Sequence, residues 1–175
     1  MTFEFEFLDF IQTLHAPIIT KIMKAASKLG DAGFIWILLA AVLLMIPKTR
    51  KVGILVSVAL LLDVITCNVI LKPLIARTRP YDVNTAVELL IRAPRDYSFP
   101  SGHTAASFAT AAALWFADKK KLAIPALVLA VLIAFSRMYF YVHYPTDVLG
   151  GAILGMVCGW LSCKLLGQKM EETMK

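Results

Sequence analysis

Charged residues are scarce in this chain, and long apolar runs stand where a soluble domain would carry them. Only 17% of the 175 residues are charged and 59% are hydrophobic, against roughly 25% and 45–50% in soluble domains. The three cysteines, Cys67, Cys158 and Cys163, all lie in apolar segments, which favours packing roles over a disulfide or a metal site. The sequence has no secretory signal pattern, internal repeat or low-complexity segment. We therefore predict one integral membrane domain over residues 1–175.

The apolar runs have helical length and predict an all-α fold, a polytopic bundle of transmembrane helices. Five segments are expected as spans: 34–46, 52–71, 104–117, 122–139 and 147–166. Residues 1–31 mix apolar positions with charges, so we expect an amphipathic helix there, broken or kinked at Pro17. If that helix also crosses, the bundle has six spans. In the last span, Gly151-x-x-x-Gly155-x-x-x-Gly159 predicts a face that packs closely on a neighbouring helix.

The order of the spans decides which polar segments meet. Two spans separate the long polar connection 72–103 from the segment 137–147, so both lie on one membrane face, and we expect the connection to be an active-site loop. The basic hairpins 47–51 and 118–121 share the opposite face with the C-terminal tail. The hairpin face holds nine Lys and Arg residues. The face with the long connection holds six, or nine if the N-terminal Lys21, Lys24 and Lys28 also lie there. The positive-inside rule places the hairpins in the cytoplasm and the loop outside the plasma membrane.

Residues suited to phosphate chemistry gather on that outer face. They are Lys72, Arg79, Ser101, Gly102, His103, Arg137, His143 and Asp147. His143 and Asp147 stand four residues apart at the start of a helix, where a carboxylate can fix the imidazole tautomer and leave the other nitrogen as base or nucleophile. A plain helix cap is the alternative role for Asp147.

The start of the 104–117 helix is suited to an anion, because its free N–H groups point back at Gly102 and His103. The cations can neutralise a transferred phosphoryl group, although basic residues near a membrane also attract lipid headgroups. Metal-dependent catalysis needs clustered carboxylates or histidines, and only Asp147 is well placed. The pattern indicates a metal-independent phosphohydrolase, and the short basic clusters are not the stripe expected of a nucleic-acid-binding protein.

Three motifs resemble, in order, the signatures of the type 2 phosphatidic acid phosphatase superfamily of membrane lipid phosphatases. They are Lys72-x6-Arg79-Pro80, Pro100-Ser101-Gly102-His103 and Ser136-Arg137-x5-His143-x3-Asp147. The resemblance implies that His143 attacks phosphorus to form a phosphohistidine, that Asp147 orients it, and that His103 protonates the leaving oxygen. It implies that the phosphate is held by Lys72, Arg79, Ser101, Gly102 and Arg137, without a metal or other cofactor.

The resemblance also implies a lipid phosphomonoester or diphosphate as the substrate, taken from the bilayer. Undecaprenyl diphosphate is the first expectation, with phosphatidylglycerophosphate, phosphatidic acid, diacylglycerol pyrophosphate and a lipid A phosphate as alternatives. A different class is an anion-binding membrane transporter. Such folds often show inverted repeats and broken helices, which this sequence lacks, and mere binding has no use for a positioned His–Asp pair.

Overall fold

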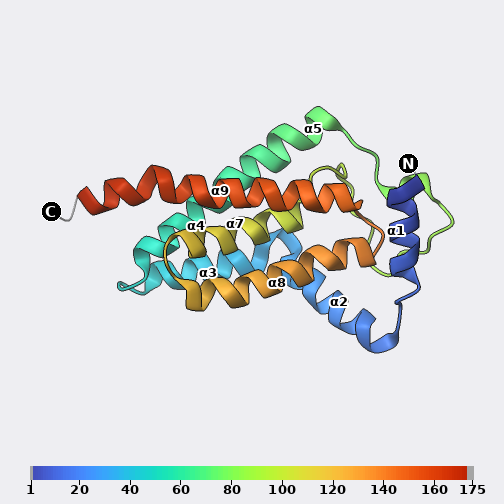
Figure 1. Ribbon diagram of the computed structural model, residues 1–175, viewed down its shortest axis with the longest axis horizontal. Coiled ribbons are helices and arrows are strands. Elements are labelled where there is room, and N and C mark those ends of the chain that lie inside the picture. Colours follow the sequence, from blue (N-terminus) through green and yellow to red (C-terminus); the bar gives the residue numbers. More distant parts are fainter. Residues whose placement is uncertain (1, 173–175) are drawn as a thin grey trace.

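The computed structural model describes residues 2–172, and the side chains of residues 3–166. Within this range the chain is helical and contains no strand, which confirms the all-α prediction. Five helices run side by side along the long axis (Figure 1): α3 (Phe34–Met45), α4 (Arg50–Asp63), α7 (Gly102–Phe116), α8 (Lys120–Tyr139) and α9 (Pro145–Glu172).

Four segments of the described chain are long and apolar enough to cross a membrane: Pro17–Met45, Arg50–Val83, Lys120–Tyr139 and Pro145–Leu166. The multi-pass prediction is therefore confirmed. The predicted span at 104–117 corresponds to α7, which has only 15 residues and a length of about 22 Å. It lies inside the bundle, with most of its residues buried.

α7 can lie in the centre because α9 approaches it without side chains between them. A Cβ added at any of the three glycines of this face would collide with a backbone oxygen of α7 or its cap residue. It would lie 2.6 Å from Ser101 O at Gly151, 2.3 Å from Ala105 O at Gly155 and 2.6 Å from Ala109 O at Gly159. Both series advance by four residues, so the two helices keep one register along their contact. The prediction of a closely packing small-residue face is confirmed.

The helix predicted over 1–31 is broken next to Pro17, one of the two outcomes expected there. The region forms two helices, α1 (Thr2–Gln12) and α2 (Pro17–Gly30), separated by a turn. Pro17 begins α2, because its fixed φ and missing N–H suit a first helical turn. α2 continues into α3 through the short turn η1 (Asp31–Gly33), where Ala32 and Gly33 have φ of 50° and 69°.

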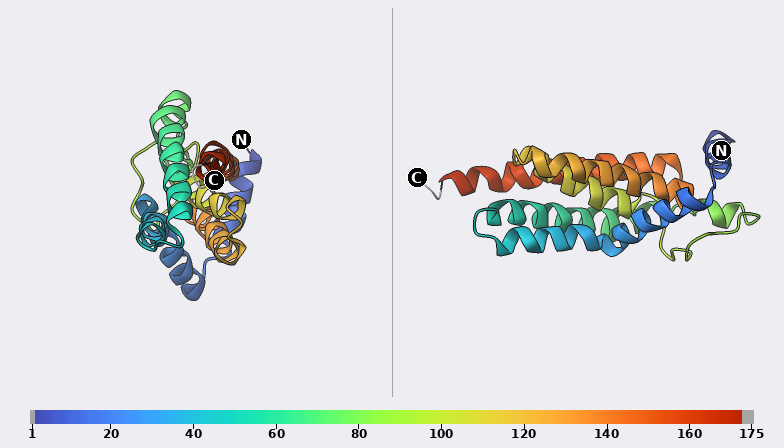
Figure 2. Two further views of the ribbon diagram at one scale, coloured as in Figure 1. Left: turned by 90° about the vertical axis from the view of Figure 1, so that its left-hand side faces the viewer. Right: turned by 90° about the horizontal axis from the view of Figure 1, so that it is seen from below.

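η2 (Val64–Leu71), a run of wider π-type turns, continues α4 and completes the segment predicted as the 52–71 span; the polar connection begins after it, at Lys72. Two short helices follow, α5 (Lys72–Ile75) and α6 (Pro80–Val83), and then an irregular loop to the start of α7. This connection and α1 lie at one end of the bundle, and the two basic hairpins lie at the other (Figure 2). The prediction from span order is thus confirmed.

Candidate active site

His143 and Asp147 face each other where α8 turns into α9. His143 Nδ1 lies 3.5 Å from Asp147 Oδ2, longer than a regular hydrogen bond, and has no other partner among the described residues. The carboxylate is fully buried and accepts hydrogen bonds from Ser98 Oγ at 2.5 Å and the Tyr144 backbone N–H at 2.9 Å. Asp147 is therefore held in place independently of the imidazole that it faces.

The other ring nitrogen of His143 points at Arg79. His143 Nε2 lies 3.2 Å from Arg79 Nη1, which also donates to the Val142 carbonyl at 2.6 Å. Burial lowers the pKa of His143 to about 3; Asp147 opposes this and the charge of Arg79 adds to it. The imidazole is neutral near pH 7. With its proton on Nδ1, toward Asp147, the Nε2 lone pair is directed at a group bound by the cations.

Lys72 and Arg79 converge on Asp96, in the loop after α6. Lys72 Nζ forms an ion pair with Asp96 Oδ2, Arg79 Nη2 lies 2.7 Å from Oδ1, and Arg79 Nε donates to the Asp96 carbonyl at 2.7 Å. Burial raises the pKa of Asp96, but the contacts with Lys72 and Arg79 outweigh it and bring the pKa to about 2. Both cations are buried and need an anion, which Asp96 supplies here.

The N-terminus of α7 directs its free N–H groups at the same region. Ser101 occupies the cap position, but its hydroxyl accepts a hydrogen bond from Thr104 Oγ1 at 3.0 Å instead of capping the helix. Its backbone N–H donates to the Asp147 carbonyl at 3.0 Å. The side chain of Ser101 is therefore buried behind the helix start, not beside the cations. Gly102 leaves the space in front open, where a Cβ would lie 3.3 Å from Asn68 Oδ1.

His103 is the second imidazole, and it is paired with Asp31. His103 Nε2 lies 2.9 Å from Asp31 Oδ1, which the kink between α2 and α3 brings to the site. Burial lowers the pKa of His103 to about 4, with the charge of Arg137 acting in the same direction and Asp31 against it. An anionic phosphate beside the ring would raise this pKa. A proton on His103 would then lie beside an oxygen of the bound phosphate.

Arg137, near the end of α8, is 2% exposed and keeps an unused donor. Its Nη1 donates to Ser27 Oγ on α2, whereas its Nε has no hydrogen-bond partner among the described residues. Buried guanidinium groups normally find partners. A free N–H on a cavity wall therefore marks a position for a ligand oxygen.

A cavity of about 380 Å³ joins these groups. Six of the eight predicted site residues line it: Lys72, Arg79, Gly102, His103, Arg137 and His143. Asp147 lies behind His143, and Ser101 lies behind the start of α7. Another part of the wall is apolar, with Ile37, Leu60, Val64 and Ala106. In the described chain no group of three or more His, Cys, Asp or Glu is arranged to hold a metal ion. The arrangement suits a phosphate carried on a lipid.

Three charged residues that pair with the predicted site residues were not themselves predicted: Arg77, Asp31 and Asp96. Arg77 Nη1 lies 2.5 Å from Asp147 Oδ1, and Arg77 Nη2 lies 2.6 Å from Glu4 Oε2 on α1. Arg77 ties the N-terminal helix to the buried carboxylate. Its position inside the first motif was a usable signal. The two aspartates lie outside all three motifs, and no spacing pointed to them.

Comparison with known proteins supports the motifs. A family model described as the PAP2 superfamily matches residues 51–171. The chain is 31% identical to an undecaprenyl-diphosphatase of Sulfolobus acidocaldarius, over 99% of this chain and 85% of that protein. It is also 31% identical to a lipid A 4'-phosphatase of Bacteroides thetaiotaomicron, over 89% and 73%. The crystal structure of Aquifex aeolicus LpxE aligns with a TM-score of 0.80 at 28% identity, over 94% of this chain and 96% of that one. The three motifs, the helical bundle and these matches together show that the chain belongs to the PAP2 superfamily.

Proposed function

We propose that the protein hydrolyses undecaprenyl diphosphate to undecaprenyl phosphate and inorganic phosphate, through a phosphohistidine. As a PAP2 lipid phosphatase it acts on a lipid phosphate in a membrane. One observation carries the proposal: the Nε2 of a buried, neutral His143 faces Arg79 on a cavity that also holds His103 and has an apolar wall.

In the first step His143 Nε2 attacks the terminal phosphorus. The P–N bond forms as the bridging P–O bond breaks, and the bridging oxygen takes a proton from His103 and leaves on the lipid phosphate. Water then attacks the phosphohistidine while His103 takes its proton, the P–N bond breaks, and inorganic phosphate is released. Asp147 keeps the reacting imidazole in the tautomer that this step needs.

The phosphoryl oxygens are bound by Lys72, Arg79, Arg137 and the N–H groups at Gly102, which lie on the cavity. Charge that spreads over these oxygens during transfer meets fixed cations and helix N–H donors. Such a cationic lining would repel a divalent ion, so we propose that no metal takes part. Ser101 contributes through its backbone, because its hydroxyl is bonded to Thr104.

Undecaprenyl diphosphate is the first substrate candidate because the relative matched over 99% of the chain carries that activity in its name. A lipid A phosphate is the second, since a named lipid A 4'-phosphatase is equally identical and LpxE shares the fold. Family membership favours both over an anion transporter. Phosphatidylglycerophosphate, phosphatidic acid and diacylglycerol pyrophosphate complete a test panel.

For the topology we propose one domain over residues 1–175 with five crossings, at 34–46, 52–71, 104–117, 122–139 and 147–166, which lie in α3, α4 with η2, α7, α8 and α9. The N-terminal helices then lie on the side of the active site, where α2 contributes Ser27 to Arg137. We propose that this side is extracytoplasmic at the plasma membrane. A cysteine introduced at Lys120 should react with an impermeant thiol reagent only after the membrane is opened, and labelling of intact cells would reverse the orientation.

The function is tested by measuring phosphate release from the lipid panel in detergent. Wild-type protein should cleave undecaprenyl diphosphate, and His143→Ala should lose this activity while its thermal unfolding midpoint stays close to wild type. His15→Ala is the matched control, because His15 does not line the cavity and its side chain hydrogen-bonds, within the described residues, only to the Tyr139 carbonyl. Retained turnover in His143→Ala would remove it as nucleophile, and cleavage of another panel member alone would replace the substrate.

A further inference from the structure

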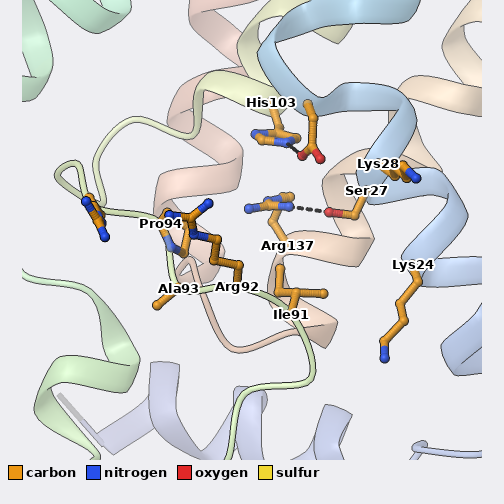
Figure 3. Close-up of a pocket in the computed structure, with 11 residues that line it drawn as sticks. Lys24, Ser27, Lys28, Ile91, Arg92, Ala93, Pro94, His103 and Arg137 are labelled. Carbon is orange, nitrogen blue, oxygen red and sulfur yellow. Dashed lines mark hydrogen bonds and ion pairs between the residues drawn. The ribbon is translucent and has the colours of Figure 1, made fainter.

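A second cavity, of about 570 Å³, adjoins the catalytic one and shares His103 and Arg137 with it. Four basic side chains from two separate elements line it: Lys24 and Lys28 on α2, Arg92 and Arg95 in the loop before α7. In Figure 3, Arg137 lies between the two lysines on one side and Arg92 on the other. None of the three signature motifs includes these four cations.

The four cations have no counter-ion in the described part of the chain. None of their side chains forms a hydrogen bond or ion pair there, whereas Lys72 and Arg79 at the catalytic end share Asp96. Asp31 is the one carboxylate among the lining residues, and it is paired with His103. The cavity therefore carries a large excess of positive charge, which attracts an anion.

The spacing of Lys24 and Lys28 along α2 places both side chains on the side of the helix that faces the second cavity. Lys24, Ser27 and Lys28 follow one another at i, i+3 and i+4, so they lie on one face of α2, and Asp31 follows directly after the end of this helix. Ser27 is bonded to Arg137, which holds that face against α8. Lys21 lies one turn before Lys24 and is exposed, as Lys24 and Lys28 are, but it does not line the cavity.

Because His103 lines both cavities, its position indicates which part of a substrate enters the second, basic cavity. In phosphoryl transfer the nucleophile and the leaving oxygen lie roughly in line on opposite sides of phosphorus. His143, Lys72 and Arg79 line only the catalytic cavity, whereas His103, which protonates the leaving oxygen, lines both. The group attached to that oxygen thus extends past His103 toward the free cations.

We propose that this basic cavity is a subsite for the second phosphate of the substrate, the one that stays on the lipid after cleavage. The inference rests on the proposed function and extends it: the enzyme prefers lipids with two linked phosphates over lipid monophosphates. Anionic headgroups of the surrounding membrane offer the same chemistry to these cations. A test must therefore separate substrate phosphate from headgroup phosphate.

The test compares farnesyl diphosphate with farnesyl monophosphate in a neutral detergent without anionic lipid. The measured quantity is the ratio of kcat/KM for the two substrates. Lys24→Gln/Lys28→Gln and Arg92→Gln/Arg95→Gln should each lower this ratio about two- to thirtyfold, the effect of losing two solvent-exposed ion pairs. Lys21→Gln, the matched control, should leave it at the wild-type value. The two double variants alter separate elements, so a folding defect in one leaves the other as a test.

An unchanged ratio in both double variants would overturn the subsite. So would an equal loss on both substrates seen only in vesicles with anionic lipid, which would assign the cations to membrane headgroups. In either case wild-type turnover of the diphosphate leaves the proposed function standing. If the wild-type protein releases no phosphate from any lipid diphosphate, the proposed function and the subsite fall together.

Discussion

Replacing Asp31 by asparagine should move the pH dependence of turnover, because Asp31 is the partner that favours a protonated His103. The amide can keep the contact with His103 Nε2, now 2.9 Å long, but it removes the negative charge. The pKa of His103 already lies below its ordinary value through burial and the charge of Arg137. Without the carboxylate it falls further, so a smaller fraction of His103 is protonated at any given pH.

The size of the shift follows from exposure. A unit charge pair at about 4 Å is worth about 1 kcal/mol in water and about 4 kcal/mol near a protein surface. The Asp31 side chain is 64% exposed, so solvent screens the pair and the lower end applies. At 1.36 kcal/mol per pKa unit, the pKa of His103 should drop by about 0.5–1 unit. The alkaline limb of kcat should move to lower pH by the same amount.

The assay is kcat against pH for the purified protein in detergent, since kcat reports groups in the enzyme–substrate complex. Asp118→Asn is the control, because Asp118 lies in the hairpin at the far end of the bundle and is exposed. A parallel loss of kcat at every pH, with the alkaline limb unmoved, would mean that Asp31 only supports the fold. An unaltered profile would remove its influence on His103.

Arg77→Gln removes a partner of the buried Asp147 and should lower the free energy of unfolding by about 1–2 kcal/mol. This is less than the roughly 3–5 kcal/mol of a fully buried pair, because the Arg77 side chain is 27% exposed. An unchanged thermal midpoint in detergent would contradict this. Gly155→Ala places a Cβ 2.3 Å from the Ala105 backbone oxygen and should lower the free energy of unfolding by about 1–3 kcal/mol, seen as a lower thermal midpoint. Exposed Ile153→Ala on the same helix should change it little. A chelator should leave phosphate release intact, and a loss restored by one divalent ion would refute the metal-free reaction.

The parts of the site that follow from counting were predicted from the sequence. Two spans lie between the second and third motifs, so a return crossing had to bring the histidines to one end of the bundle. The glycines of α9 repeat every four residues, and the α7 backbone oxygens that they face do the same. Both inferences need only helix geometry and the order of elements, and the structure agrees with them.

The N-terminal region could not be predicted in the same way, because an amphipathic pattern does not say where one helix ends. Pro17 is compatible with a kink inside a helix and with the first turn of a new one. The structure adopts the second, and the chain then enters α3 through positive φ at Ala32 and Gly33. Only Gly33 carried a signal for this, since alanine rarely adopts that conformation.

The charged partners escaped the sequence analysis for a different reason. A motif names the cations because a phosphate needs them, but in the free protein buried cations still need an anion. Asp96 serves Lys72 and Arg79 from an irregular loop, and Asp31 serves His103 from a kink, so no helical spacing pointed to either. If the proposed phosphate site is right, we expect substrate oxygens to replace Asp96 as the partners of Lys72 and Arg79. On that expectation, affinity depends on the difference between two sets of charge-assisted hydrogen bonds, and changes in the loop that carries Asp96 should alter substrate affinity.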